Sequence, residues 1–197
     1  MIPGAPKPRT VASASSEADA LAGGSRLRAI VRDHLAFTWR SLRRLGLPDD
    51  VADDAVQSVF LVTAAKLDGI KPGSERAFLF NTAVRVASSE KRTFGRRRES
   101  PGDDVVEELP DPAPAADEQL DRHRARQVLE ELLLELEMDL RAVFVLFELE
   151  ELSTAEISTT LEIPMGTVSS RLRRAREEFQ VATKRYRARS RAAQGGT

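Results

Sequence analysis

Apolar residues recur at steps of three and four along the N-terminal half of the chain, which is the spacing of amphipathic helices. The pattern predicts one helix from residue 26 to a C-cap near Gly46, a second from about residue 51 to 67, and a third over residues 75–98. Between the first two, a proline followed by two aspartates predicts a turn in which Asp49 or Asp50 caps the second helix. Glycine and proline predict a loop before the third helix.

The C-terminal half predicts four more helices, of which the last two are joined by a tight turn. Two amphipathic segments come first, over residues 128–136 and 140–147. Ser153 is then a good N-cap, and Glu156 completes a capping box, so a short helix is expected to run to about Leu161. Pro164 disfavours helix at the residue before it and suits the first turn of a new helix. This order and spacing are those of a helix-turn-helix unit.

The helix after Pro164 combines an apolar stripe with a polar, basic side. The stripe falls at helical spacing and comprises Val168, Leu172, Ala175 and Phe179. The opposite side carries Thr167, Ser170, Arg171, Arg173 and Arg174. Arginine pairs bidentately with guanine or phosphate, and hydroxyls reach bases or phosphates, so this side has the expected make-up of a recognition helix in the DNA major groove. The same arginines also fit a solvated basic helix in an ordinary bundle.

Two surfaces of the N-terminal half are further candidates for binding. The second helix is expected to pack through its apolar positions, namely Ala55, Val56, Val59, Phe60 and Val62. Its other side carries a mixed group that suits docking on a protein and equally fits a solvated helix with one exposed leucine: Asp50, Asp54, Gln57, Ser58 and Leu61. The third helix starts with Phe78 and Phe80 and ends in cations, a combination able to stack unpaired bases and hold a backbone, although both phenylalanines also suit a core.

The nearly neutral net charge hides a segregation of charge along the chain. The 197 residues include 31 acidic and 30 basic side chains, a formal net charge of −1. Residues 99–121 hold nine of the acids and no lysine or arginine, so the remainder has 22 acids against 30 basic residues, about +8. A neutral total is therefore no argument against a nucleic-acid partner.

Together these patterns predict an all-α protein of two small helical domains joined by an acidic, proline-rich linker. The first domain is expected at residues 26–98, the linker at 99–120 and the second domain at 121–180. Residues 1–25 are rich in Ala, Ser, Gly and Pro and are expected to form a disordered tail. Residues 181–197 are expected to be a basic tail that can add non-specific phosphate contacts.

Composition argues against several functional classes. The chain has no cysteine, which excludes disulfides and thiolate metal sites and suits a reducing cytosol. No apolar run approaches a membrane span and no signal-peptide core is present, so a soluble, cytoplasmic protein without a membrane partner is expected. His34 and His123 stand alone and no glycine-rich phosphate loop occurs, so no enzyme, metal, cofactor or small-molecule substrate is expected.

Two motifs in this order resemble the bacterial RNA polymerase sigma factors, specifically the extracytoplasmic-function (ECF) group of the sigma-70 family. The polymerase-docking helix of sigma region 2 is similar to LPDDVADDAVQSVFL, in which Asp54, Gln57 and Phe60 match the family's DAxQxVF. The helix-turn-helix of sigma region 4 is similar to LSTAEISTTLEIPMGTVSSRLRRARE. The second motif also occurs in other regulators, whereas both motifs split by an acidic linker are specific. The resemblance covers about residues 26–98 and 121–179.

The resemblance implies three sets of site residues. Core RNA polymerase would be bound by Asp54, Gln57, Ser58, Phe60 and Leu61. The minus-ten promoter element would be captured and held by Lys71, Phe78, Asn81, Arg85, Lys91 and Arg92. The minus-thirty-five element would be read by Thr167, Ser169, Ser170, Arg171, Arg173 and Arg174. The resemblance also implies that the linker runs through the RNA channel of the polymerase, which suits its negative charge.

Four positions depart from the family pattern. Phe78 replaces the usual tryptophan, and Arg85 replaces an asparagine that many relatives use near the melted base, which leaves the minus-ten sequence open. Ser169 replaces the usual basic residue after GTV and removes one expected DNA contact. Glu162 replaces the usual glycine of the helix-turn-helix turn, which costs about 1–2 kcal/mol if that position is left-handed.

The resulting hypothesis is a dissociable transcription initiation factor that recognises a two-part promoter and helps to melt it. Its expected partners are core RNA polymerase and promoter DNA, and the resemblance adds an anti-sigma factor as a further candidate. The alternative is a conventional helix-turn-helix regulator that binds duplex DNA without polymerase, which gives no role to the mixed face of the second helix. A purely structural helical adaptor is a further alternative, and it would tolerate loss of the recognition-helix arginines.

Overall fold

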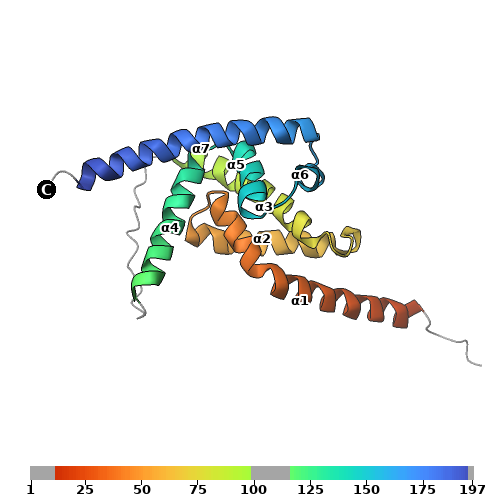
Figure 1. Cartoon of the computed structure of the whole chain (residues 1–197). Coiled ribbons are helices and arrows are strands. Elements are labelled where there is room, and N and C mark those ends of the chain that lie inside the picture. Colours follow the sequence, from red (N-terminus) through yellow and green to blue (C-terminus); the bar gives the residue numbers. More distant parts are fainter. Residues whose placement is uncertain (1–11, 99–115, 195–197) are drawn as a thin grey trace, which may run out of the picture.

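A computed structural model describes residues 12–98 and 116–194, and all regular structure within these ranges is helical (Figure 1). The predicted all-α fold is therefore confirmed. No helix in the described ranges is both long and apolar enough to cross a membrane. Most of the predicted linker, residues 99–115, lies outside the described residues.

The first domain consists of three helices that pack on one another. They are α1 (Ala12–Arg44), α2 (Asp49–Ala65) and α3 (Glu75–Arg98), with a short 3-10 turn, η1 (Leu67–Gly69), after α2. The third helix has the predicted bounds. Phe80 is buried and its ring lies 6.4 Å from that of Phe37, so Phe80 belongs to the core, whereas Phe78 is only half-buried.

The first domain also differs from the sequence prediction. The first helix begins at Ala12, inside the stretch expected to be a disordered tail, because the alanine-rich residues after it have high helix propensity. The second helix is preceded by Pro48, which makes no side-chain cap, and the two aspartates lie inside its first turn, where the helix dipole favours carboxylates. Val62, which was predicted to lie in the core, is 38% exposed, and Thr63 is buried in its place. The Thr63 hydroxyl can be buried because it donates to the Val59 carbonyl at 2.8 Å.

The second domain contains the remaining helices. They are α4 (Ala116–Leu134), α5 (Met138–Phe144), the π-helical turn η2 (Val145–Leu149), α6 (Thr154–Leu161) and α7 (Met165–Gln194). The last of these continues through residues 181–194, which were expected to be a tail. No glycine or proline interrupts that stretch, so nothing in the sequence ends the helix earlier.

The two domains pack against each other, and a buried arginine of α5 ties them together. Arg141 is fully buried, and its Nη1 donates to the carbonyl of Leu45, just past the C-terminal end of α1, at 2.5 Å. Its Nη2 donates to the carbonyls of Leu134 and Leu136 at 3.0 and 2.8 Å. Burial lowers the pKa of Arg141 to about 10, so the guanidinium stays charged at neutral pH. One side chain thus satisfies carbonyls that helix α1 and the α4–α5 turn leave without partners.

Gly46 makes room for this arginine. It ends α1 as the predicted C-cap in a left-handed conformation with φ 99°, and Leu47 donates to the Leu42 carbonyl at 3.1 Å as in a Schellman motif. A Cβ at Gly46 would lie 2.4 Å from Arg141 Nη1. Both the backbone conformation and the close approach therefore require glycine.

A buried carboxylate makes a second tie between the domains. The side chain of Glu150, which follows η2, is only 6% exposed and pairs with both Arg44 of α1 and Arg76 of α3. Because the carboxylate is held by two cations, neither domain can move away without leaving a buried charge unpaired.

Replacing Arg141 by alanine is expected to lower the free energy of unfolding by at least about 2 kcal/mol, because several buried carbonyls lose their donor. Chemical denaturation measures the change. Arg40→Ala on the exposed side of α1 is the matched control and should change stability by no more than about 0.5 kcal/mol. Equal stability of the two variants would contradict the role assigned to Arg141.

Candidate nucleic-acid interface

The helix-turn-helix unit of α6 and α7 begins with the predicted capping box. The Glu156 backbone N–H donates to Ser153 Oγ at 3.3 Å, and the Ser153 backbone N–H donates to Glu156 Oε2 at 2.8 Å. Hydrogen bonds from the Ser153 hydroxyl and backbone lower the pKa of the Glu156 carboxyl. The cap fixes where α6 starts and hence where the following turn lies.

The turn between α6 and α7 is left-handed at Glu162, with φ 56° and ψ 40°. The Ile163 N–H donates to the Ser158 carbonyl at 3.1 Å, and the Ser158 hydroxyl donates to the Ile163 carbonyl at 2.6 Å. The Pro164 carbonyl then accepts from the first turn of α7. A glutamate therefore occupies the strained position that glycine would adopt without strain.

Helix α7, the predicted recognition helix, buries the predicted stripe. Val168, Leu172 and Ala175 are buried, and the Phe179 ring stacks on that of Phe144 with 4.7 Å between centroids. The predicted DNA-reading residues lie away from this core. Four of them are exposed: Ser169, Ser170, Arg173 and Arg174. Two are half-buried: Thr167 and Arg171.

Each arginine of this set is paired with a carboxylate. Arg171 pairs with Asp139 at the start of α5, and Arg174 lies 3.8 Å from Glu137. On α7 itself, Arg173 and Arg174 pair with Glu177 and Glu178, each at 2.8 Å. Exposed pairs of this kind contribute at most about 1 kcal/mol, so a phosphate or a guanine edge can replace the carboxylate.

The candidate docking face of α2 is also largely exposed. Asp54, Gln57, Ser58 and Leu61 are open to solvent, and Leu61 is 71% exposed. Phe60 is half-buried and packs against the core, so it lies beneath this face and is less accessible to a partner than the other four residues.

A hollow of about 620 Å³ beside Gln57 extends this face onto α1. Its lining includes Leu35, which is 48% exposed, and Trp39, whose Nε1 donates to Asp53 at 3.0 Å. Leu35 and Trp39 fall at the three- and four-residue apolar steps that predict the first helix, so helical periodicity places them on its packed side and does not indicate this surface. An indole with a polar partner beside an exposed leucine is the signal that marks it.

The α3 candidates are spread along one helix and the loop before it. Lys71, Arg85, Lys91 and Arg92 are exposed, whereas Phe78 and Asn81 are half-buried. Although Lys91 is exposed overall, partial desolvation of its side chain and the nearby Arg141 lower its pKa, which indicates that this lysine lies near the domain junction. Arg85 Nη2 lies 3.7 Å from Glu162 Oε2, which brings two positions that depart from the family pattern into contact.

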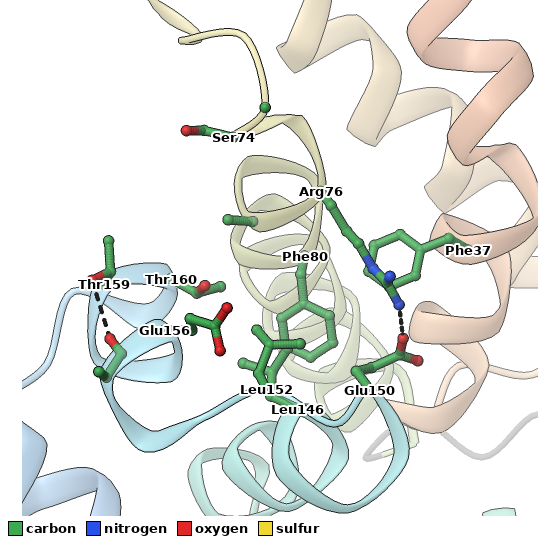
Figure 2. Close-up of a pocket in the computed structure, with 13 residues that line it drawn as sticks. Phe37, Ser74, Arg76, Phe80, Leu146, Glu150, Leu152, Glu156, Thr159 and Thr160 are labelled. Carbon is green, nitrogen blue, oxygen red and sulfur yellow. Dashed lines mark hydrogen bonds and ion pairs between the residues drawn. The ribbon is translucent and has the colours of Figure 1, made fainter.

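A cleft of about 520 Å³ lies between α3 and α6, as Figure 2 shows. Its apolar lining comprises Phe37, Ala77, Phe80, Leu146, Leu152 and Ala155. The Arg76–Glu150 pair closes one side, and Glu156 and Thr159 line the α6 side. In the described ranges no three His, Asp or Glu side chains gather in a way that could hold a metal ion.

Comparison with known proteins places both domains among sigma factors. Residues 126–179 match the family described as Sigma-70, region 4. The RNA polymerase sigma-E factor of Streptomyces avermitilis is 34% identical over 76% of this chain and 83% of its own length. The ECF RNA polymerase sigma-E factor of Escherichia coli K12 is 30% identical over 66% and 73%. The ECF RNA polymerase sigma factor SigE of Mycolicibacterium smegmatis is 27% identical over 77% of this chain, which spans only 59% of that relative.

Two solved structures have the same fold. The sigma factor RpoE of Bartonella quintana, solved with the anti-sigma factor NepR, matches 78% of this chain and 96% of its own with a TM-score of 0.57 and 26% identity. CnrH, solved with the cytosolic domain of CnrY, matches 85% and 94% with a TM-score of 0.60 and 22% identity.

Glu162→Gly is expected to raise the free energy of unfolding by about 0.5–1 kcal/mol. Glycine adopts the left-handed turn without strain, and part of this gain is offset by the greater freedom of glycine in the unfolded chain. Thermal unfolding measures the shift. Glu162→Ala is the matched control, because it removes the same carboxylate but keeps the Cβ, and it should not stabilise the protein. Equal effects of the two changes would place the cause in the charge and not in the backbone.

Proposed function

Because this chain belongs to the ECF RNA polymerase sigma factors of the sigma-70 family, we propose that it binds core RNA polymerase and directs it to specific promoters as a transcription initiation factor. The observation that carries the proposal is the presence, in one chain, of an exposed docking face on α2 and a helix-turn-helix with an arginine-bearing recognition helix. The role needs no catalysis, cofactor or metal from this chain. We propose that it acts in the cytoplasm, where polymerase and promoter meet.

The first domain binds polymerase and the minus-ten element. The exposed leucine of α2, surrounded by a carboxylate and an amide, combines apolar burial with polar groups that fix register on a partner helix. On α3, the half-buried Phe78 and Asn81 lie where an unstacked base can be captured, and the exposed Arg85, Lys91 and Arg92 hold the strand. Binding an unstacked base favours the melted state of the promoter, which is how this domain aids opening.

The second domain reads the minus-thirty-five element. The start of α7 enters the major groove, as recognition helices of this class do, and Arg171 and Arg174 reach base edges or phosphates. The acidic partners of these arginines must be released first. A DNA sequence that offers an arginine no better partner than its carboxylate gains little binding free energy. The replacement of carboxylate by DNA therefore contributes to specificity.

This function requires the domain junction to open. By their positions the two promoter elements are about 25 base pairs apart, or about 85 Å along the duplex. With the junction closed, however, Arg85 of the proposed minus-ten surface lies only 3.7 Å from Glu162 in the helix-turn-helix turn. The residues between Arg98 and Ala116 can span at most about 60 Å, which is enough to let the domains part. The ties made by Arg141 and Glu150 therefore break when both elements are engaged.

An anti-sigma factor is a further proposed partner. One structural relative, the sigma factor RpoE of Bartonella quintana, was solved with an anti-sigma factor, NepR. A partner of this kind would restrain initiation by covering surfaces that polymerase or promoter needs.

Run-off transcription with core RNA polymerase on fragmented genomic DNA of the host, with and without this protein, tests the proposal. Discrete new transcripts are expected, and their start sites map both promoter elements. No transcripts, together with tight duplex binding by the protein alone, would instead establish a conventional helix-turn-helix regulator.

Arg171→Ala and Arg174→Ala should each weaken binding of the holoenzyme to the minus-thirty-five element by about 1–3 kcal/mol if each arginine is bidentate to a base. Footprinting on a mapped promoter measures the loss. Arg124→Ala on α4 is the control, because this arginine is exposed and lies outside the proposed interface. An unchanged footprint in both recognition-helix variants would contradict their role.

Asp54→Ala and Gln57→Ala should weaken capture of core polymerase while binding of the full chain to a duplex with the minus-thirty-five element stays unchanged. Both side chains are exposed, so their removal affects the partner surface and not core packing. Competition for core polymerase measures the first effect and duplex titration the second. Asp121→Ala is the control, and parallel loss of both activities would indicate misfolding.

A further inference from the structure

The last part of α7 carries a group of cations that the proposed function leaves unused. We define the C-terminal arm as residues 181–194 of α7. It contains no acidic residue and five basic ones: Lys184, Arg185, Arg187, Arg189 and Arg191. All five side chains are exposed. The arm is therefore a rigid helical surface of one sign of charge.

The arm cations differ from the earlier arginines of α7 in their partners. Each of the earlier arginines pairs with a carboxylate: Arg171, Arg173, Arg174 and Arg176. In the part of the chain that the structure describes, none of the five arm cations makes an ion pair or a side-chain hydrogen bond. An anionic ligand can therefore bind the arm without displacing an internal partner.

Helical geometry aligns the arm with the proposed DNA-reading residues. Successive residues turn an α-helix by about 100°, so positions 7 or 11 apart lie on nearly the same side. One line continues from Arg173 and contains Lys184, Arg187 and Arg191. A second line continues from Arg171 and contains Arg185 and Arg189. The two lines extend the proposed DNA interface along the helix, and no acidic residue follows Glu178.

The arm is held in this direction by packing. Ala182 is buried and Tyr186 is half-buried. The fourth helix contacts α7 and lies beneath its C-terminal half in Figure 1. The five cations therefore lie on the two flanks of α7, on either side of the inner line that contains Ala182 and Tyr186.

The position of the arm determines which part of a nucleic acid it can reach. The 30 residues of α7 span about 45 Å, and the arm begins about 24 Å from Met165. The major groove is only about 12 Å wide. When the start of α7 lies in the groove, the arm lies beyond it, beside backbone phosphates and away from base edges.

We propose that the C-terminal arm is a second DNA-binding surface, which holds the phosphate backbone flanking the groove occupied by the start of α7. The inference rests on the proposed function, because the direction of the arm is argued from the recognition helix. Its ligand is the sugar-phosphate backbone of duplex DNA, bound independently of sequence. The arm thereby strengthens and steers binding while the start of α7 selects the site.

The test compares two variants of the full chain in which the same amount of charge is removed. In the arm variant, four of the five arm cations are changed to glutamine: Lys184, Arg185, Arg187 and Arg189. In the control variant, four exposed basic residues outside the proposed interfaces are changed to glutamine: Arg28, Arg32, Lys66 and Arg124. Each protein is titrated with a short duplex of scrambled sequence over a range of salt concentrations. Each is then titrated, as holoenzyme, with a promoter mapped by run-off transcription.

The arm variant is expected to bind both duplexes at least about tenfold more weakly than wild type at low salt, with unchanged start sites. The logarithmic dependence of affinity on salt should become shallower by about 0.9 for each phosphate that the variant no longer neutralises. The control variant should retain most of the wild-type affinity and salt dependence. Thermal unfolding of both variants verifies that they are folded.

A salt dependence that is the same in the arm and control variants would overturn the proposal. So would arm-dependent binding to vesicles of phosphatidylserine and phosphatidylcholine without any change in duplex binding, because the ligand would then be a lipid surface. If wild-type protein yields no run-off transcripts, the initiation role fails, but titration with the scrambled duplex still decides whether the arm binds DNA.

Discussion

The arrangement of the two domains depends on one buried guanidinium. Arg141 supplies donors to a carbonyl at the end of α1 and to two carbonyls around the α4–α5 turn, so neither domain surface is complete without the other. Gly46 is needed beside it because a side chain there would occupy the same space. Since a buried charge without its partners is costly, a partly opened junction is less favourable than one that is fully closed or fully opened to water. Such a contact suits the proposed function, in which the two proposed DNA-binding surfaces separate.

Charge pairing divides the long last helix into two zones. At its start, every arginine of the predicted DNA-reading set is paired with a carboxylate, so in the proposed function DNA must replace that carboxylate before binding gains energy. Along the arm the described cations have no internal partner, and any phosphate is an improvement over water and salt. The first condition favours discrimination between sites, and the second favours general attraction to DNA. A single continuous helix can hold both because its inner side is fixed by the stripe from Val168 to Phe179.

Local signals determined much of this protein from its sequence. The capping box of Ser153 and Glu156, the apolar stripe of α7 and the bounds of α3 depend on interactions within a few residues, which a sequence displays directly. The family resemblance marked Glu162 as a position that would be strained if left-handed, and the structure shows it there with φ 56°. Family resemblance added the assignment to sigma factors, which the comparisons confirmed.

Only the tertiary structure decided which residues meet across long sequence separations. Thr63 is buried and Val62 is exposed because of how α2 packs on its neighbouring helices. Leu35 is exposed because no other helix in the described ranges covers that part of α1. Nothing in the sequence near Arg141 or Glu150 marks them as the ties between domains, because their partners lie in other helices. Helical periodicity fixes which side of a helix is apolar, but the carbonyl or carboxylate that a polar side chain meets depends on how the helices are placed in space.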